Sequence, residues 1–188
     1  MEFKEVVDQY YEMIIELGGM SLPSESIPKQ MMDFDRTSNF EGISYWKRID
    51  STITNNEVLE LEKFFSAKLP RQLKEFVQDK FYLDLEFGDH AFRVFKLTPD
   101  LKLEHWKNEI LENYENLYSK GYLIFGETDS AVLCLDTKEV QDPEKFEVGL
   151  IDIYSDEYLK LANNFNEFTD QLNTWLSDWK NSKINYRT

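Results

Sequence analysis

The stretch from Thr54 to Val77, TNNEVLELEKFFSAKLPRQLKEFV, constrains the fold more than any other part of this chain. Thr54 followed by Glu57 has the spacing of a capping box, in which the hydroxyl accepts the Glu57 amide and the carboxylate reaches back to the Thr54 amide. Ile53 and Val58 occupy the two positions that a hydrophobic staple requires. The sequence therefore predicts a helix that begins directly after Thr54.

The second half of this stretch predicts another helix. We expect Leu69-Pro70 to end the first helix and to begin the second, because proline is preorganised for the first helical position. Apolar residues at helical spacing give both helices a buried face. They are Val58, Leu61 and Phe65 in the first helix, and Leu73, Phe76 and Val77 in the second.

The pattern then changes to the period of two that is typical of strands. We expect strands at 81–87, 91–97, 122–125, 131–135 and 146–152, with a helix at 103–117 between the second and third. Further helices are expected at 3–17 and 165–179. Helices that flank sequential strands indicate an α+β fold with a mixed or antiparallel sheet of about five to six strands.

The predicted organisation is a single domain. Residues 1–45 form an N-terminal helix and a connection that packs on the domain, where Met31, Met32, Phe34 and Phe40 are expected to cover the core. Residues 46–180 form the domain itself, and 181–188 a short tail.

The charge limits the classes of partner. The chain has 36 acidic and 21 basic residues, for a net charge of −15. Such a field repels nucleic acid and anionic membrane surfaces, and it attracts basic proteins; plain solubility is the alternative explanation. The N-terminus lacks the pattern of a secretory signal and no stretch is apolar enough to span a membrane, so a cytoplasmic protein is expected. Cys134, the single cysteine, is expected to be a buried structural thiol.

Motifs of enzyme chemistry are absent from the sequence. It contains no phosphate-binding glycine loop, no CxxC, no HExxH and no GxSxG. The best metal candidate is the group Asp84, Glu86, Asp89 and His90, but these residues also fit the solvent face of an amphipathic strand, which is the favoured interpretation. We therefore expect a protein that is not an enzyme and holds no metal or cofactor; a carboxylate-metal enzyme is the alternative.

A local excess of acid lies between Glu127 and Glu147, where seven acidic residues accompany two lysines. Such a face suits a basic partner, although a solvated hairpin would look the same. The predicted partner-binding residues are Glu127, Asp129, Asp136, Glu139 and Asp142, with Asp84, Glu86 and Asp89 as a second strip.

The order of these segments resembles the SUKH superfamily, also called the SMI1/KNR4 family. The matching segments are WKRIDSTITNNEVLELEKFFSAKLPRQLKEFV, YLIFGETDSAVLCLD, FEVGLIDIY and LANNFNEFTDQL. Like members of that family, the chain has a helix before a Leu-Pro pair, a strand with Gly126, a strand that ends at Asp136, and a late helix start at Phe165-Asn-Glu167-Phe168. The resemblance covers about residues 46–172. In place of the Gly- or Asn-rich turn usual after the second helix, this chain has Gln78-Asp-Lys80.

The resemblance implies a non-enzymatic α+β binding domain. Many bacterial members of this family resemble immunity proteins, which neutralise a cognate polymorphic toxin, often a nuclease, by direct binding. The acidity of this chain agrees with that role, because nuclease toxins are commonly basic. A general protein–protein interaction or regulatory module, as in fungal members, is the alternative.

Overall fold

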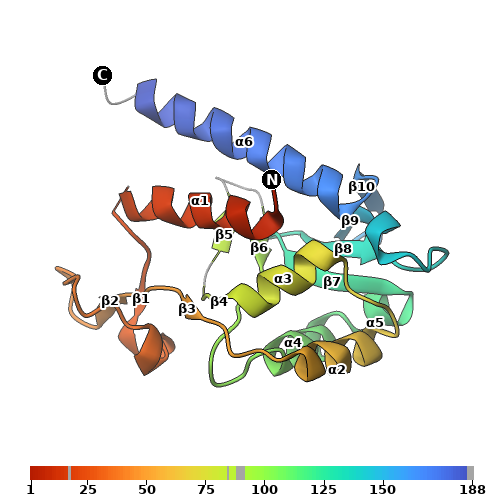
Figure 1. Ribbon diagram of the computed structural model, residues 1–188, viewed down its shortest axis with the longest axis horizontal. Coiled ribbons are helices and arrows are strands. Elements are labelled where there is room, and N and C mark those ends of the chain that lie inside the picture. Colours follow the sequence, from red (N-terminus) through yellow and green to blue (C-terminus); the bar gives the residue numbers. More distant parts are fainter. Residues whose placement is uncertain (17, 84, 88–91, 186–188) are drawn as a thin grey trace.

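The computed structural model describes residues 1–16, 18–83, 85–87 and 92–185, with the side chains of 86, 92 and 181–185 excepted (Figure 1). Asp84, Asp89 and His90 lie outside the described residues, as does the side chain of Glu86. The acidic strip predicted at 84–89 therefore stays a prediction.

A six-stranded antiparallel sheet forms the centre of the molecule, with strand order β10-β9-β8-β7-β6-β5. Each strand pairs with its neighbour along the chain, so the sheet is a meander. This confirms the predicted α+β class with an antiparallel sheet. The strands are β5 (Leu85–Phe87), β6 (Phe92–Val94), β7 (Tyr122–Glu127), β8 (Ala131–Asp136), β9 (Glu147–Asp152) and β10 (Tyr158–Ala162).

The strand expected at 81–87 is divided in two. Its beginning, β4 (Lys80–Phe81), pairs with β3 (Ile49–Asp50) in a separate two-stranded sheet, and β5 alone joins the main sheet. Strand β10 was not among the expected strands. Its five residues show no clear alternation of burial, because it lies at the edge of the sheet.

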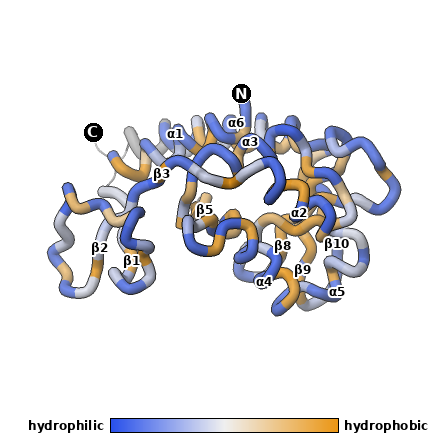
Figure 2. The backbone as a smooth tube through the Cα atoms, turned by 60° about the horizontal axis from the view of Figure 1, so that its bottom comes forward, coloured by the Kyte–Doolittle hydropathy of each residue, from blue (hydrophilic) through white to orange (hydrophobic). Residues whose placement is uncertain are grey.

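The helices lie on both sides of this sheet. In Figure 1, α1 (Phe3–Glu16) and α6 (Phe165–Asn185) lie above the strands, and α2 (Asn55–Phe65) and α4 (Glu104–Asn113) lie below them, with α5 (Glu115–Ser119) next to β7 and α3 (Arg71–Asp79) next to α1. The last helix continues to Asn185, into the segment expected as a tail. Figure 2 shows hydrophobic stretches along β8 and β9, and most residues of these two strands are buried.

The N-terminal helix is part of the core. The Phe3 ring contacts Phe76 of α3 and Phe165 of α6, with ring centroids 4.9 and 5.1 Å away. The Phe3 amide donates to Oε1 of Gln72 at 2.6 Å, and the Thr169 hydroxyl donates to the same oxygen at 3.2 Å. Helices α1, α3 and α6 are thus joined by rings and by one buried amide side chain.

The connection after α1 packs less fully than expected. It forms the hairpin of β1 (Ser21–Pro23) and β2 (Ile43–Tyr45) with two short 3-10 turns, at 24–26 and 29–31. Met31 is buried, but Phe34 is 72% exposed and Phe40 is 75% exposed, so the expectation that these rings cover the core was wrong. Both phenylalanines lie in the loop that joins β1 to β2, and this loop extends away from the main sheet (Figure 1).

The capping box of α2 is confirmed. The Glu57 amide donates to the Thr54 hydroxyl at 3.3 Å, and the Thr54 amide donates to the Glu57 carboxylate at 2.7 Å. Ile53 and Val58 are both buried, as the hydrophobic staple requires.

The helix junction differs from the prediction. Helix α2 ends at Phe65, because Ser66 adopts a left-handed conformation with φ +53°, and Pro70 lies at the N-cap of α3 instead of its first turn. Between them, the buried Glu62 carboxylate accepts the Leu69 amide at 2.9 Å and pairs with Lys74 at 2.6 Å. A side chain of α2 therefore holds the link and α3 in place.

The helix expected at 103–117 is interrupted at Tyr114. This residue has φ −134°, which ends α4 and precedes α5. Its ring stacks on Phe95 with centroids 6.2 Å apart, and its hydroxyl donates to Glu127. The two contacts turn Tyr114 toward the sheet at the cost of helical continuity.

Candidate binding surface

The predicted acidic residues do not form one patch. The strand register places Asp136 of β8 beside Tyr122 and Glu147, and places Ala131, at the other end of β8, beside Asp152. The six residues of β8 span about 17 Å at the usual rise per residue. Glu127 and Asp129 thus lie at one end of the sheet, and Asp136, Glu139 and Asp142 at the other.

Glu127 is held inside the molecule. Its side chain is 16% exposed, and its carboxylate accepts hydrogen bonds from Arg93 Nε at 2.8 Å and from the Tyr114 hydroxyl. Burial, together with this carboxylate, raises the pKa of Tyr114 well above its usual range. Glu127 therefore joins β7 to β6 and to the junction of α4 and α5.

Three of the five acids between Asp136 and Glu147 pair with nearby lysines. We call this region, residues 136–147, the far end. Asp136 lies 3.7 Å from Lys138, and Asp142 lies 3.4 Å from Lys145. Glu147 pairs with Lys160 at 2.6 Å. These pairs reduce the field that the far end presents to a partner.

The opposite end of the sheet consists of two adjacent turns. We call residues 128–130 and 152–157 the turn end. The Ile153 amide donates to the Ser130 carbonyl at 3.0 Å, which joins the β7–β8 turn to the β9–β10 turn. These segments contain four acids, Asp129, Asp152, Asp156 and Glu157, and no Lys or Arg. Lys120 pairs with Asp156 at 2.6 Å.

Asp152 organises the second turn. Its Oδ1 accepts the amides of Tyr154 and Ser155 at 2.9 and 2.8 Å and the Ser155 hydroxyl at 3.0 Å. These hydrogen bonds lower the pKa of Asp152, so the carboxylate stays ionised. The turn presents Tyr154 to solvent with 83% of its surface exposed, next to Ile153 at 41%. Sequence reasoning stopped at Glu147 and missed this turn, although Asp152-Ile-Tyr-Ser-Asp-Glu157 shows the acids and the tyrosine together.

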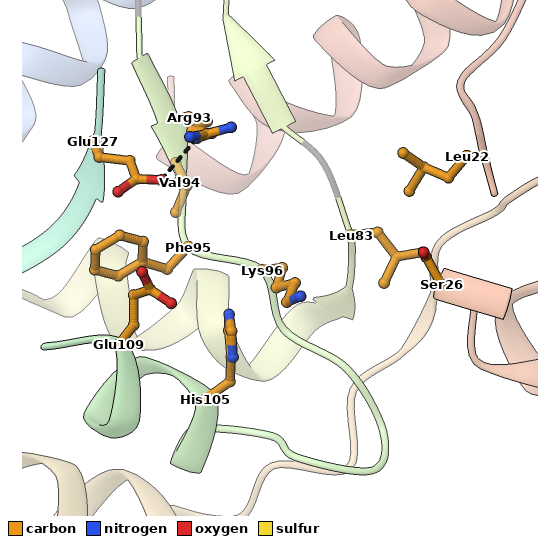
Figure 3. A pocket seen from close by; sticks show the side chains of 10 residues that line it. All are labelled: Leu22, Ser26, Leu83, Arg93, Val94, Phe95, Lys96, His105, Glu109 and Glu127. Carbon is orange, nitrogen blue, oxygen red and sulfur yellow. Dashed lines mark hydrogen bonds and ion pairs between the residues drawn. The ribbon is translucent and has the colours of Figure 1, made fainter. Parts of the chain in front are cut away.

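A hollow of about 370 Å³ lies between β6, α4 and the N-terminal hairpin (Figure 3). Its lining has both charge signs, with Arg93 and Lys96 facing the same space as Glu109 and Glu127. Burial and the charge of Lys96 lower the pKa of His105, which favours a neutral imidazole there. Within the described part of the chain, no three His, Cys, Asp or Glu side chains gather as metal ligands would.

Cys134 lies in the middle of β8 with its thiol buried. Its Sγ is 3.6 Å from the Gly149 carbonyl oxygen, and burial raises the pKa of the thiol well above its usual range. A thiol in this state is a poor nucleophile, in agreement with a structural role.

In the described residues, no helix is both long and apolar enough to cross a membrane.

Comparison with known proteins gives one family. No curated protein matches the chain. The model of the SMI1 / KNR4 family (SUKH-1) matches residues 52–171, which begin just before the capping box and extend into α6. This match covers more than half of the chain and agrees with the α+β meander. The chain therefore belongs to the SMI1/KNR4 family (SUKH-1).

Proposed function

We propose that this chain is a non-enzymatic binding protein, and that it acts as an immunity protein that neutralises a cognate toxin by direct binding. Membership of the SMI1/KNR4 family supports a binding role. The observation that carries the proposal is the net charge of −15, to which the segment from Glu127 to Glu157 contributes ten acids and two lysines. A basic toxin domain is the partner that such a charge attracts.

The proposed mechanism is occlusion assisted by charge. Acidic side chains at the edges of the sheet increase the rate of encounter with a basic protein, and close packing then blocks its active surface. A nuclease fits this scheme, because an enzyme that holds nucleic acid presents lysine and arginine to the phosphates. The bound immunity protein would cover those same groups.

The test uses, as the candidate toxin, the protein domain encoded by the gene next to the gene for this chain. Co-expression of this chain should restore growth to cells that produce the domain, and the two purified proteins should form a stable complex. Association should slow by roughly tenfold or more when the salt concentration rises from about 50 to 500 mM, because electrostatic steering is screened. Growth that is not restored would refute the immunity role. An association rate that does not change with salt would refute the steering mechanism.

A general interaction module is the second candidate. The exposed Phe34 and Phe40 favour it, because they lie in the N-terminal hairpin, outside the residues that match the family. Exposed aromatic side chains of this kind are typical of interaction surfaces. A stable complex with a neighbouring protein that does not inhibit growth would support this candidate over the immunity role.

A further inference from the structure

Resting on the proposed function, we infer that the turn end is the part of the surface that docks on the basic partner, and that Tyr154 is its central anchor. The far end then contributes little to binding. The two ends of the sheet differ in the exposure of their apolar side chains, in the hydrogen bonds that order their turns, and in their charge.

Three large apolar or aromatic side chains of the outermost hairpin are exposed. Ile153, Tyr154 and Leu159 are 41, 83 and 62% exposed. The strand register places Leu159 beside Leu150, and Leu150 beside Leu133. This row passes from the fully buried Leu133 through the partly buried Leu150 to the exposed Leu159 on the edge strand β10. The apolar row of the sheet thus reaches the surface at Leu159, on the same hairpin as Tyr154, where a partner would bury both side chains.

The turn that carries Tyr154 is already ordered by hydrogen bonds within the chain. Besides the three hydrogen bonds that Asp152 accepts, its amide donates to the Glu157 carbonyl at 3.0 Å, and the Asp156 amide donates to the Asp152 carbonyl at 3.0 Å. The link from Ile153 to Ser130 fixes this turn to its neighbour. Little backbone freedom remains to be lost on binding, so burial of Tyr154 contributes more fully to affinity.

The charge and polarity of the turn end identify its occupant. The two turns of the turn end contain four acids, and the pair formed by Lys120 and Asp156 neutralises one of them. A second copy of this chain is disfavoured, because a two-fold interface would bring the same acidic surface against itself. A protein surface rich in Lys and Arg, with a pocket for one aromatic ring, is complementary in both charge and polarity. Tyrosine is among the residues that most often dominate such interfaces.

The experiment measures binding of the full-length chain to the domain encoded beside it. Tyr154→Ser should raise the Kd by about 10- to 100-fold, mainly through faster dissociation. Phe40→Ser is the matched control, because Phe40 is an exposed ring of similar accessibility, 75%, at a distant place in the fold. Its Kd should stay within about twofold of the parent value. Both side chains are solvent-exposed, so neither variant should unfold the protein.

Two charge variants separate the ends of the sheet. Asp129→Asn with Glu157→Gln removes two charges from the turn end, and Glu139→Gln with Asp142→Asn removes two from the far end. The first pair should lower the association rate at low salt by about three- to tenfold, and the second by less than twofold.

The outcomes are distinguishable. If the parent chain binds but Tyr154→Ser binds within twofold of it, or if Phe40→Ser is the variant that weakens binding, the inference is wrong while the proposed function stands. Equal effects of the two charge pairs would also overturn it. If the parent chain forms no complex with the domain, the proposed function fails, and this inference fails with it.

Discussion

Glu62 provides the sharpest test of how the helical pair is held together. Its carboxylate is 7% exposed and serves two groups of the next segment, the Leu69 amide at 2.9 Å and the Lys74 ammonium at 2.6 Å. Leu69 is 1% exposed, so its amide lies away from solvent. The substitution Glu62→Ala removes the acceptor of this amide. An unsatisfied buried donor costs about 1–3 kcal/mol.

The ion pair adds a smaller amount. Lys74 is 33% exposed, so solvent screens its interaction with Glu62, which we take as about 1 kcal/mol. Together the two losses predict that Glu62→Ala lowers the free energy of unfolding by about 2–4 kcal/mol. Glu62→Gln retains an oxygen that can accept from Leu69 and should lose only about 1 kcal/mol.

Urea denaturation followed by tryptophan fluorescence measures both values, provided that the slope with denaturant is unchanged. Glu60→Ala is the matched control on the same helix. Glu60 is 60% exposed and pairs with Lys63 at 2.6 Å, so its removal should cost less than about 0.5 kcal/mol. Equal stability of Glu62→Ala and Glu60→Ala would show that the Glu62 carboxylate does not hold the link between α2 and α3.

Three further predictions concern the rest of the fold. The side chain of Lys102 and the Thr54 amide hold the pKa of Glu57 at about 2, below its ordinary 4.5. The ionised carboxylate therefore stabilises the fold above pH 4.5, and this stabilisation is lost as the pH falls toward 2. Glu57→Gln should therefore reduce the loss of stability between pH 7 and pH 3 in urea titrations. Phe3→Ala should lower the free energy of unfolding by about 3–5 kcal/mol, because its ring fills the space between α3 and α6; a loss below 1 kcal/mol would show that α1 is not part of the core. Gly126→Ala should lower the free energy of unfolding by about 1–3 kcal/mol and lower the melting temperature, because a Cβ there would lie 2.6 Å from the Arg93 carbonyl oxygen of the adjacent strand. An unchanged melting temperature would contradict this close approach.

The sequence by itself determined the features that depend on near neighbours along the chain. The capping box of α2 joins residues three positions apart, and its partners are therefore visible in the sequence. Alternation of apolar residues likewise predicted β9, because side chains of a strand point to opposite faces in turn. The short apolar runs at 122–125 and 131–135 predicted β7 and β8, which are buried at consecutive positions. The order of these local patterns was enough to indicate the family.

Other features were decided only by the tertiary structure. Whether an acid is free or compensated depends on which lysine folds next to it, as Lys160 does beside Glu147, thirteen positions earlier in the chain. The exposure of Tyr154, Phe34 and Phe40 depends on which surfaces the rest of the chain covers. The path of the link between α2 and α3 depends on the Glu62 carboxylate, which reaches across the junction to Leu69. These contacts join residues that lie further apart in the sequence than one helical turn or one strand repeat, so no local pattern records them.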